Sequence, residues 1–149
     1  MLGRGERRAL ARRLPATGLG GLAVAAALIG CGGIKAPDLF IVERTGSVAG
    51  ARLTLLVNEE GGVRCNGGRT LKLSDPALID ARALQEELSG PASKHLSLPA
   101  GPGSVFSYYV RDENGTVSFS DNSSRQPAVL RRLALFVLQT AQQVCGLPM

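Results

Sequence analysis

The segment near the C-terminus constrains the fold most, because its apolar side chains recur at the spacing of one helix face. Pro127 is typical of a helix start, and Gly146 with Pro148 is typical of a helix end. The apolar positions all fall within about 140° of a helical wheel; they are Leu130, Leu133, Ala134, Val137, Leu138, Ala141, Val144 and Cys145. A helix with this face must bury it against a second layer of structure.

The chain before this helix supplies that layer, because it contains several short β-rich runs separated by turn residues. Alternation of side-chain types predicts strands at residues 39–43, 51–57, 63–65, 70–73, 104–111 and 116–120. Asn114-Gly115 between the last two runs is a strong hairpin signal. In residues 105–110 both alternating sets contain apolar side chains, so the inward face of that strand stays open.

A first helix is predicted between the strands. Ser74-Asp75-Pro76 is typical of a helix start, and residues 89–91 are expected to end it. The order of strands, helix, hairpin and helix predicts an α+β fold. We expect an antiparallel sheet of about four to five strands with two helices packed on one face, which leaves the other face of the sheet for a partner.

The first thirty residues follow the pattern of an export signal. Arginines gather in residues 1–13, and residues 14–30 are apolar apart from Thr17. This apolar stretch is rich in glycine and short for a membrane span, which needs about 20 apolar residues. We therefore predict a signal peptide over residues 1–30, a tether over residues 31–38 and a single α+β domain over residues 39–149.

The end of this segment, Leu28-Ile29-Gly30-Cys31, resembles the lipobox of bacterial lipoproteins. The resemblance implies cleavage between Gly30 and Cys31, and attachment of diacylglycerol to the Cys31 thiol, usually followed by a further acyl chain such as palmitate. Two or three acyl chains anchor a protein stably. The expected location is the extracytoplasmic face of the cell membrane or outer membrane. The alternative is an ordinary cysteine after an uncleaved helix.

If Cys31 carries lipid, Cys65 and Cys145 remain as an even pair in an oxidising compartment, and we predict that they form a disulfide. Val63 and Cys65 are two apart and face one side of a strand, while Cys145 shares the apolar face of the last helix. The bond would therefore join sheet to helix, and the long loop that it closes would stabilise the fold by roughly 4 kcal/mol. Two free thiols or a metal pair are the alternatives.

Charge and composition argue against nucleic-acid binding. The formal net charge is +5 and the pI is about 9.6, but the excess of arginine lies in the first thirty residues. The remainder has no basic run that could displace counterions from a phosphate backbone. The chain has four Phe, two Tyr and no Trp, so stacking surfaces for bases are scarce.

The sequence does not predict an enzyme. His95 is the only imidazole, and no Gly-x-Ser-x-Gly elbow or phosphate-binding Gly-x-x-x-x-Gly-Lys loop occurs. The carboxylate pairs Glu59-Glu60 and Glu86-Glu87 lack the apolar setting that raises a carboxyl pKa for acid catalysis. We expect His95 to be a surface or capping residue, and we predict no catalytic residue, no cofactor and no metal site.

The mature part resembles a second family, the emfourin-type inhibitors of thermolysin-like proteases. The likeness lies in residues 41–50, where a strand ends in Arg44 and leads into Thr45-Gly46 and Val48-Ala49-Gly50, and in residues 106–110, 115–119 and the helix from Pro127. Val48 stands where that family favours an aromatic residue. The resemblance implies a non-catalytic domain that binds an extracytoplasmic metalloprotease. Two other hypotheses are a structural or chaperone-like envelope lipoprotein and a small-ligand carrier.

Overall fold

The computed structural model describes residues 37–148. The predicted signal peptide, its cleavage site at Gly30 and the predicted lipidation site Cys31 lie outside these residues. Within residues 37–148, no helix has the length and apolar character needed to span a bilayer.

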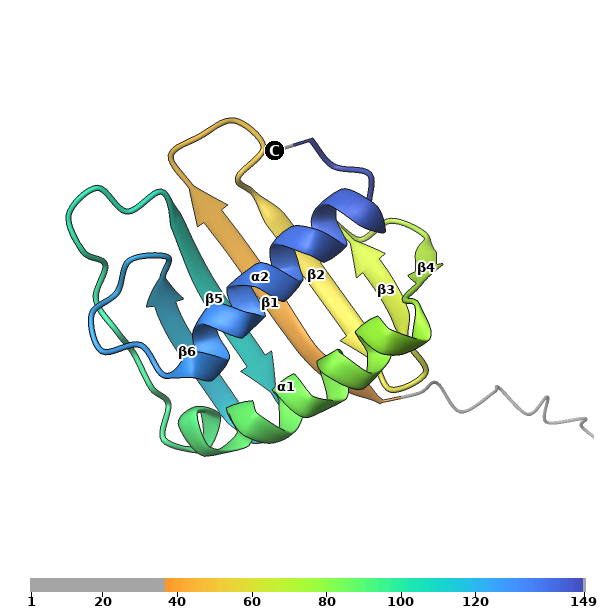
Figure 1. The fold of residues 1–149 in the computed structure, drawn as a ribbon, viewed down its shortest axis with the longest axis horizontal. Coiled ribbons are helices and arrows are strands. Elements are labelled where there is room, and N and C mark those ends of the chain that lie inside the picture. The colour runs from red at the N-terminus through yellow and green to blue at the C-terminus, as the bar shows by residue number, and fades with distance from the viewer. Residues whose placement is uncertain (1–36, 149) are drawn as a thin grey trace, which may run out of the picture. The chain divides into compact units, whose positions relative to one another are not determined.

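The core of the domain is a six-stranded antiparallel sheet with the strand order β4-β3-β2-β1-β5-β6 (Figure 1). The sheet is wider than the four to five strands expected, because even the short residues 70–72 pair with β3. The strands are β1 (Asp38–Gly46), β2 (Leu53–Asn58), β3 (Gly62–Cys65), β4 (Thr70–Lys72), β5 (Phe106–Asp112) and β6 (Gly115–Ser120).

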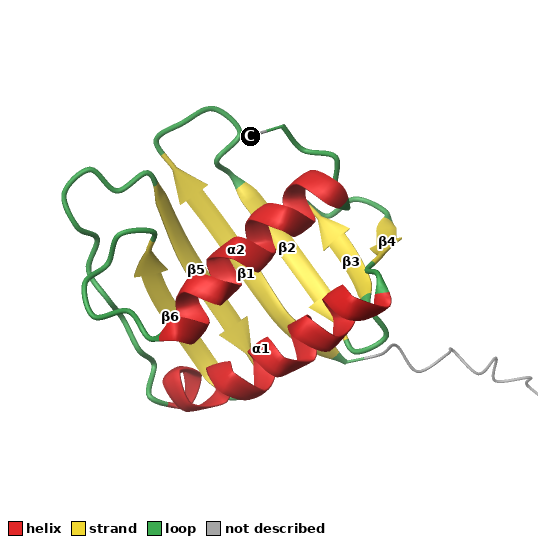
Figure 2. Cartoon of the chain, in the orientation of Figure 1, coloured by secondary structure: helices red, strands yellow, loops and turns green. Residues whose placement is uncertain are grey.

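Both helices, α1 (Asp75–Ser93) and α2 (Ala128–Gln143), lie on the same face of this sheet (Figure 2). The α+β class predicted from the sequence is thereby confirmed. The Phe40 ring of β1 meets the Phe136 ring of α2 edge-on, with 6.0 Å between centroids. Leu84 and Leu88 of α1 and Leu133 of α2 are fully buried. The apolar stripe of each helix is thus covered by the sheet and by the other helix.

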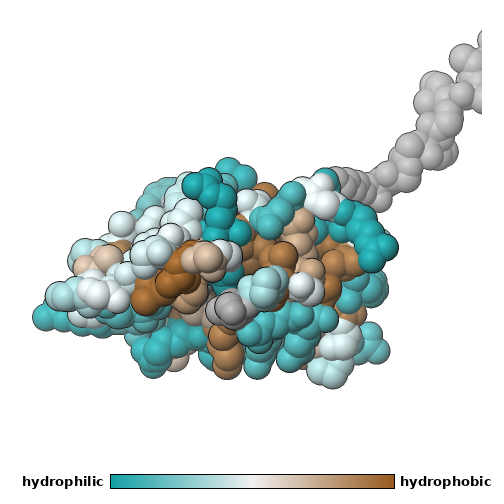
Figure 3. Space-filling model, turned by 90° about the horizontal axis from the view of Figure 1, so that it is seen from above, coloured by the Kyte–Doolittle hydropathy of each residue, from teal (hydrophilic) through white to brown (hydrophobic). Residues whose placement is uncertain are grey.

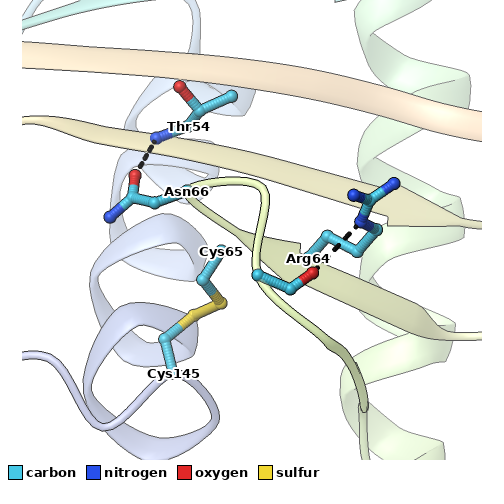
Figure 4. Close-up of a disulfide and its surroundings, with 6 residues drawn as sticks. Thr54, Arg64, Cys65, Asn66 and Cys145 are labelled. Atoms are coloured by element: carbon cyan, nitrogen blue, oxygen red, sulfur yellow. Dashed lines mark hydrogen bonds between the residues drawn. A yellow bond between two sulfur atoms is a disulfide. The ribbon is translucent and has the colours of Figure 1, made fainter.

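Cys65 ends β3 and Cys145 follows α2, and the two form a disulfide with 6.1 Å between Cα atoms and a sequence separation of 80 (Figure 4). This is the pairing predicted from the sequence. Asn66, the next residue, has a positive φ of 51°, and its side-chain oxygen accepts a hydrogen bond from the Thr54 amide at 2.8 Å. The turn after β3 is therefore held both to β2 and to the end of α2.

Helix α1 extends further than expected, because it continues through Gly90 and Pro91 to Ser93. Ala92 is buried in the core, and tertiary packing of this kind can hold a helical turn that sequence preferences alone would end. Ser74 is the N-cap residue, and its side chain makes no capping hydrogen bond.

The connection after α1 runs alongside the edge strand β6. Ser97 and Ser118 form an isolated parallel bridge. The Leu98 amide donates to the Ser118 carbonyl at 2.8 Å, and the Ser118 amide donates to the Leu96 carbonyl at 2.9 Å. This short segment, residues 96–98, therefore pairs with the outer edge of the sheet.

Candidate functional site

The most specific local arrangement lies at the β1–β2 loop, which we define as residues 47–52. Arg44 of β1 is only 1% exposed and points toward the helix-covered side, where its neighbours in the alternation are Phe40 and Val42. Its Nε donates to the Ala51 carbonyl at 2.8 Å and its Nη2 donates to the Gly50 carbonyl at 3.2 Å. A buried guanidinium needs such partners to offset its lost hydration, so Arg44 ties the loop to the core.

The Arg44 guanidinium also lies over the Phe106 ring, with 5.0 Å from Cζ to the ring centroid. Contacts between a cation and an aromatic face are attractive and are stronger away from water. The arginine thus links three segments: the strand that carries it, the loop it bonds, and the start of β5.

The other end of the loop is fixed by backbone contacts with the residue before β5. The Ser47 amide donates to the Val105 carbonyl at 3.1 Å. Gly46 lies so close to this strand that a Cβ on it would stand 2.3 Å from the Val105 carbonyl oxygen. Within the loop, the Ala51 amide donates to the Val48 carbonyl at 3.2 Å, and Gly50 adopts a positive φ of 76°.

Asp121 holds residues 104–106, the segment to which the β1–β2 loop is hydrogen-bonded. Its carboxylate accepts hydrogen bonds from the Ser104 hydroxyl at 2.8 Å, from the Val105 amide at 3.1 Å and from the Phe106 amide at 3.2 Å. Burial alone would raise the pKa of Asp121, but these hydrogen bonds favour the charged form and bring the pKa below its ordinary value of 3.8.

The outer part of the loop faces solvent and carries one large apolar side chain, Val48, which is 48% exposed. Figure 3 looks onto the end of the domain that holds this loop, and there hydrophobic patches are bordered by hydrophilic surface. The geometry therefore presents an apolar residue on a backbone whose position is already fixed. Binding through such a loop costs less conformational entropy than binding through a mobile one.

A second surface is the face of the sheet opposite the helices, which we call the open face. It contains a shallow pocket of about 350 Å³ between β1, β5, β6 and residues 98–100. The lining mixes apolar and polar side chains, which are Leu98, Ala100, Tyr108 and Phe119 together with Glu43, Thr45, Ser107, Tyr109, Ser118 and Ser120. The polar groups can bond a polar side chain of a partner, but they do not form a nucleophile with a neighbouring base.

The polar residues considered in the sequence do not gather into one site. His95 is exposed, with Nδ1 3.2 Å from the Thr116 hydroxyl oxygen. Glu59 and Glu60 lie exposed in the β2–β3 turn. Glu87 of α1 forms an ion pair with Arg132 of α2. Within residues 37–148, no cluster of three or more His, Cys, Asp or Glu residues could hold a metal ion.

The burial of Arg44 and its bonds to the loop were not predicted from the sequence. A signal was present, because Arg44 continues the inward series of Phe40 and Val42 in an alternating strand. A charged residue at an inward position indicates a buried polar partner. Which backbone carbonyls it would meet depends on the path of the loop.

No protein-family model matches the chain, and neither a curated protein nor a solved structure matches it. The resemblances to the lipobox and to the emfourin-type inhibitors therefore stay predictions.

Proposed function

We propose that this protein is a lipid-anchored, extracytoplasmic lipoprotein whose non-catalytic domain binds and inhibits a thermolysin-like metalloprotease through the β1–β2 loop. The observation that carries the proposal is the attachment of this loop at both ends, by Arg44 to the carbonyls of Gly50 and Ala51 and by Ser47 to Val105. The exposed Val48 lies between these attachments.

Physical reasons connect this geometry with inhibition. A loop that is already ordered loses little entropy when it enters the cleft of an enzyme. An apolar anchor that fills a pocket of the partner supplies much of the binding energy of a protein interface. The hydrogen bonds to Arg44 and Val105 also keep the loop from adopting the extended conformation in which a protease cleaves a peptide chain.

The test is inhibition of thermolysin by the soluble ectodomain, residues 32–149, measured as hydrolysis of a peptide substrate. We expect the wild type to slow hydrolysis at stoichiometric amounts. The inhibition constant should be at least tenfold larger for Val48→Asp, because a charge at the tip of the loop opposes entry into an apolar pocket. Ile79→Asp is the matched control, since Ile79 is 67% exposed on α1. Absence of inhibition across several thermolysin-like proteases would refute this part of the proposal.

The anchor is tested separately on native material. We expect a measured mass that corresponds to a chain beginning at Cys31 with diacylglycerol attached. We also expect Cys31→Ala to abolish membrane association. An intact chain that still begins at Met1 and carries an unmodified Cys31 thiol would contradict the anchor and leave the protease assay unaffected.

A structural envelope lipoprotein is the second candidate. It is favoured by the open face of the sheet, where Tyr109 is 41% exposed and its neighbours are polar. This candidate predicts a protein partner in the envelope and no effect on any protease.

A further inference from the structure

The register of the sheet places four side chains in one row across the open face. Leu56 of β2 pairs with Arg64 of β3 on one side and with Ile41 of β1 on the other. Ile41 in turn pairs with Arg111 of β5. Directly paired residues of antiparallel strands point to the same face. An apolar pair, Ile41 and Leu56, is therefore flanked by an arginine at each end, and we call these four residues the arginine-flanked row.

The side chains of this row are accessible. Ile41 and Leu56 are partly exposed, although both are apolar. Arg111 is exposed, and its guanidinium makes no hydrogen bond or ion pair with any other residue in the range 37–148. Arg64 donates weakly to the Gly67 and Gly68 carbonyls, each at 3.3 Å, and so is held near its end of the row. Figure 4 shows one of these two bonds.

The charge around the row is positive. Among the strand residues that face the open side, the cations are Arg64, Lys72 and Arg111, and the anions are Glu43 and Asp38, the latter paired with Asn58. The ion pairs within the described domain lie on the helix side, where Arg132 meets Asp80 and Glu87. The row itself carries two arginines and no carboxylate, and within residues 37–148 neither guanidinium forms an ion pair.

We propose that the arginine-flanked row is a docking surface for a partner protein whose contact surface has apolar side chains flanked by carboxylates. An apolar centre with a polar rim is the usual anatomy of a protein interface, and Arg and Tyr are enriched in it. Tyr109 lies on the same face, two residues before Arg111, and extends the centre. Arginine binds carboxylate through two parallel hydrogen bonds, which fixes orientation as well as affinity.

The dimensions specify the partner further. Arg64 and Arg111 are separated by three strand spacings, so their backbones stand about 14 Å apart. The partner must therefore present two carboxylates at roughly this separation with an apolar patch between them. A second copy of this chain fits poorly in a face-to-face arrangement, because the cations of both faces would repel one another.

This surface is distinct from the β1–β2 loop, and the inference does not depend on protease inhibition. The test introduces the photoreactive residue p-benzoylphenylalanine at Tyr109 of the full chain, in the cells that produce it. We expect one discrete protein adduct on irradiation, with the cross-link beside Asp or Glu residues of the partner. The double variant Arg64→Glu, Arg111→Glu should reduce its yield at least tenfold.

Two control variants separate the explanations. Arg69→Glu, Arg125→Glu reverses two exposed charges outside the row and should leave the adduct unchanged. Val48→Asp should also leave it unchanged, whereas it weakens inhibition under the proposed function. The melting temperature of each variant checks that its domain is folded.

The inference is overturned by any of four results in folded variants. These are no adduct, an adduct with lipid or glycan, an adduct with a second copy of the chain, and a protein adduct that is insensitive to Arg64→Glu, Arg111→Glu.

Discussion

Replacing Arg44 by Met tests how firmly the β1–β2 loop is tied to the core. Methionine keeps much of the apolar stem but removes both hydrogen bonds to the loop carbonyls. Hydrogen bonds from a charged donor contribute about 1.5–3 kcal/mol each. The Ala51 bond lies in the buried interior and should count fully, whereas Gly50 is exposed and its carbonyl can bond water instead. Loss of the contact with Phe106 adds about 1 kcal/mol.

We therefore expect Arg44→Met to lower the free energy of unfolding by about 3–4 kcal/mol. With a urea m-value of about 2 kcal/mol/M, the unfolding midpoint should fall by about 1.5–2 M. Circular dichroism in urea measures the midpoint, and amide hydrogen exchange should show faster exchange in residues 47–52 than in β2.

The matched control is Arg82→Met on α1. The Arg82 side chain is exposed and donates to the Glu59 carbonyl, so its loss should cost less than about 1 kcal/mol. A cost below about 1 kcal/mol for Arg44→Met, with exchange in the loop as slow as in the wild type, would refute the attachment of the loop by Arg44.

Three further outcomes are expected. Replacing Cys65 and Cys145 by Ala should lower stability by roughly 4 kcal/mol in a urea titration, and an unchanged midpoint would contradict the role of the crosslink. Gly46→Ala should cost about 1–3 kcal/mol because its Cβ meets the rigid Val105 carbonyl, and a neutral result would disprove the close approach. The lowered pKa of Asp121 stabilises the fold above pH 3.8, and this contribution is lost as pH falls through the folded-state pKa. The melting temperature should therefore drop more steeply in acid for the wild type than for Asp121→Asn, and parallel curves would contradict the stabilising role of the carboxylate.

The sequence predicts the helical layer from local periodicity, and it predicts the crosslink from the cysteine pair that remains once Cys31 is assigned to lipid. The α2 stripe identifies Leu130, Leu133 and Val137 as core residues, and all three are buried. Phe136 of the same helix is also buried although it lies outside the predicted stripe, because it packs against Phe40 of β1. Which side chains fill the edge of a stripe depends on the neighbouring layer, which a single segment does not specify.

Other features depend on tertiary contacts and could not be predicted. In residues 105–110 both alternating sets contain apolar side chains, and the structure places Tyr108 and Val110 inward. Tyr108 stacks on Phe119 with 4.8 Å between centroids, a contact that requires the partner strand β6. The loop contacts of Arg44 and the composition of the arginine-flanked row likewise follow from strand order and register.

The pairing of residues 96–98 with β6 also affects whether copies of this domain aggregate through their sheet edges at high density. An outer strand with free amides and carbonyls is a template on which a strand from another molecule can add. Here the Ser118 amide and carbonyl are already bonded to Leu96 and Leu98, and the opposite border is the three-residue β4. Both borders of the sheet thus offer little for stepwise growth into a fibre, even where the molecules are crowded together.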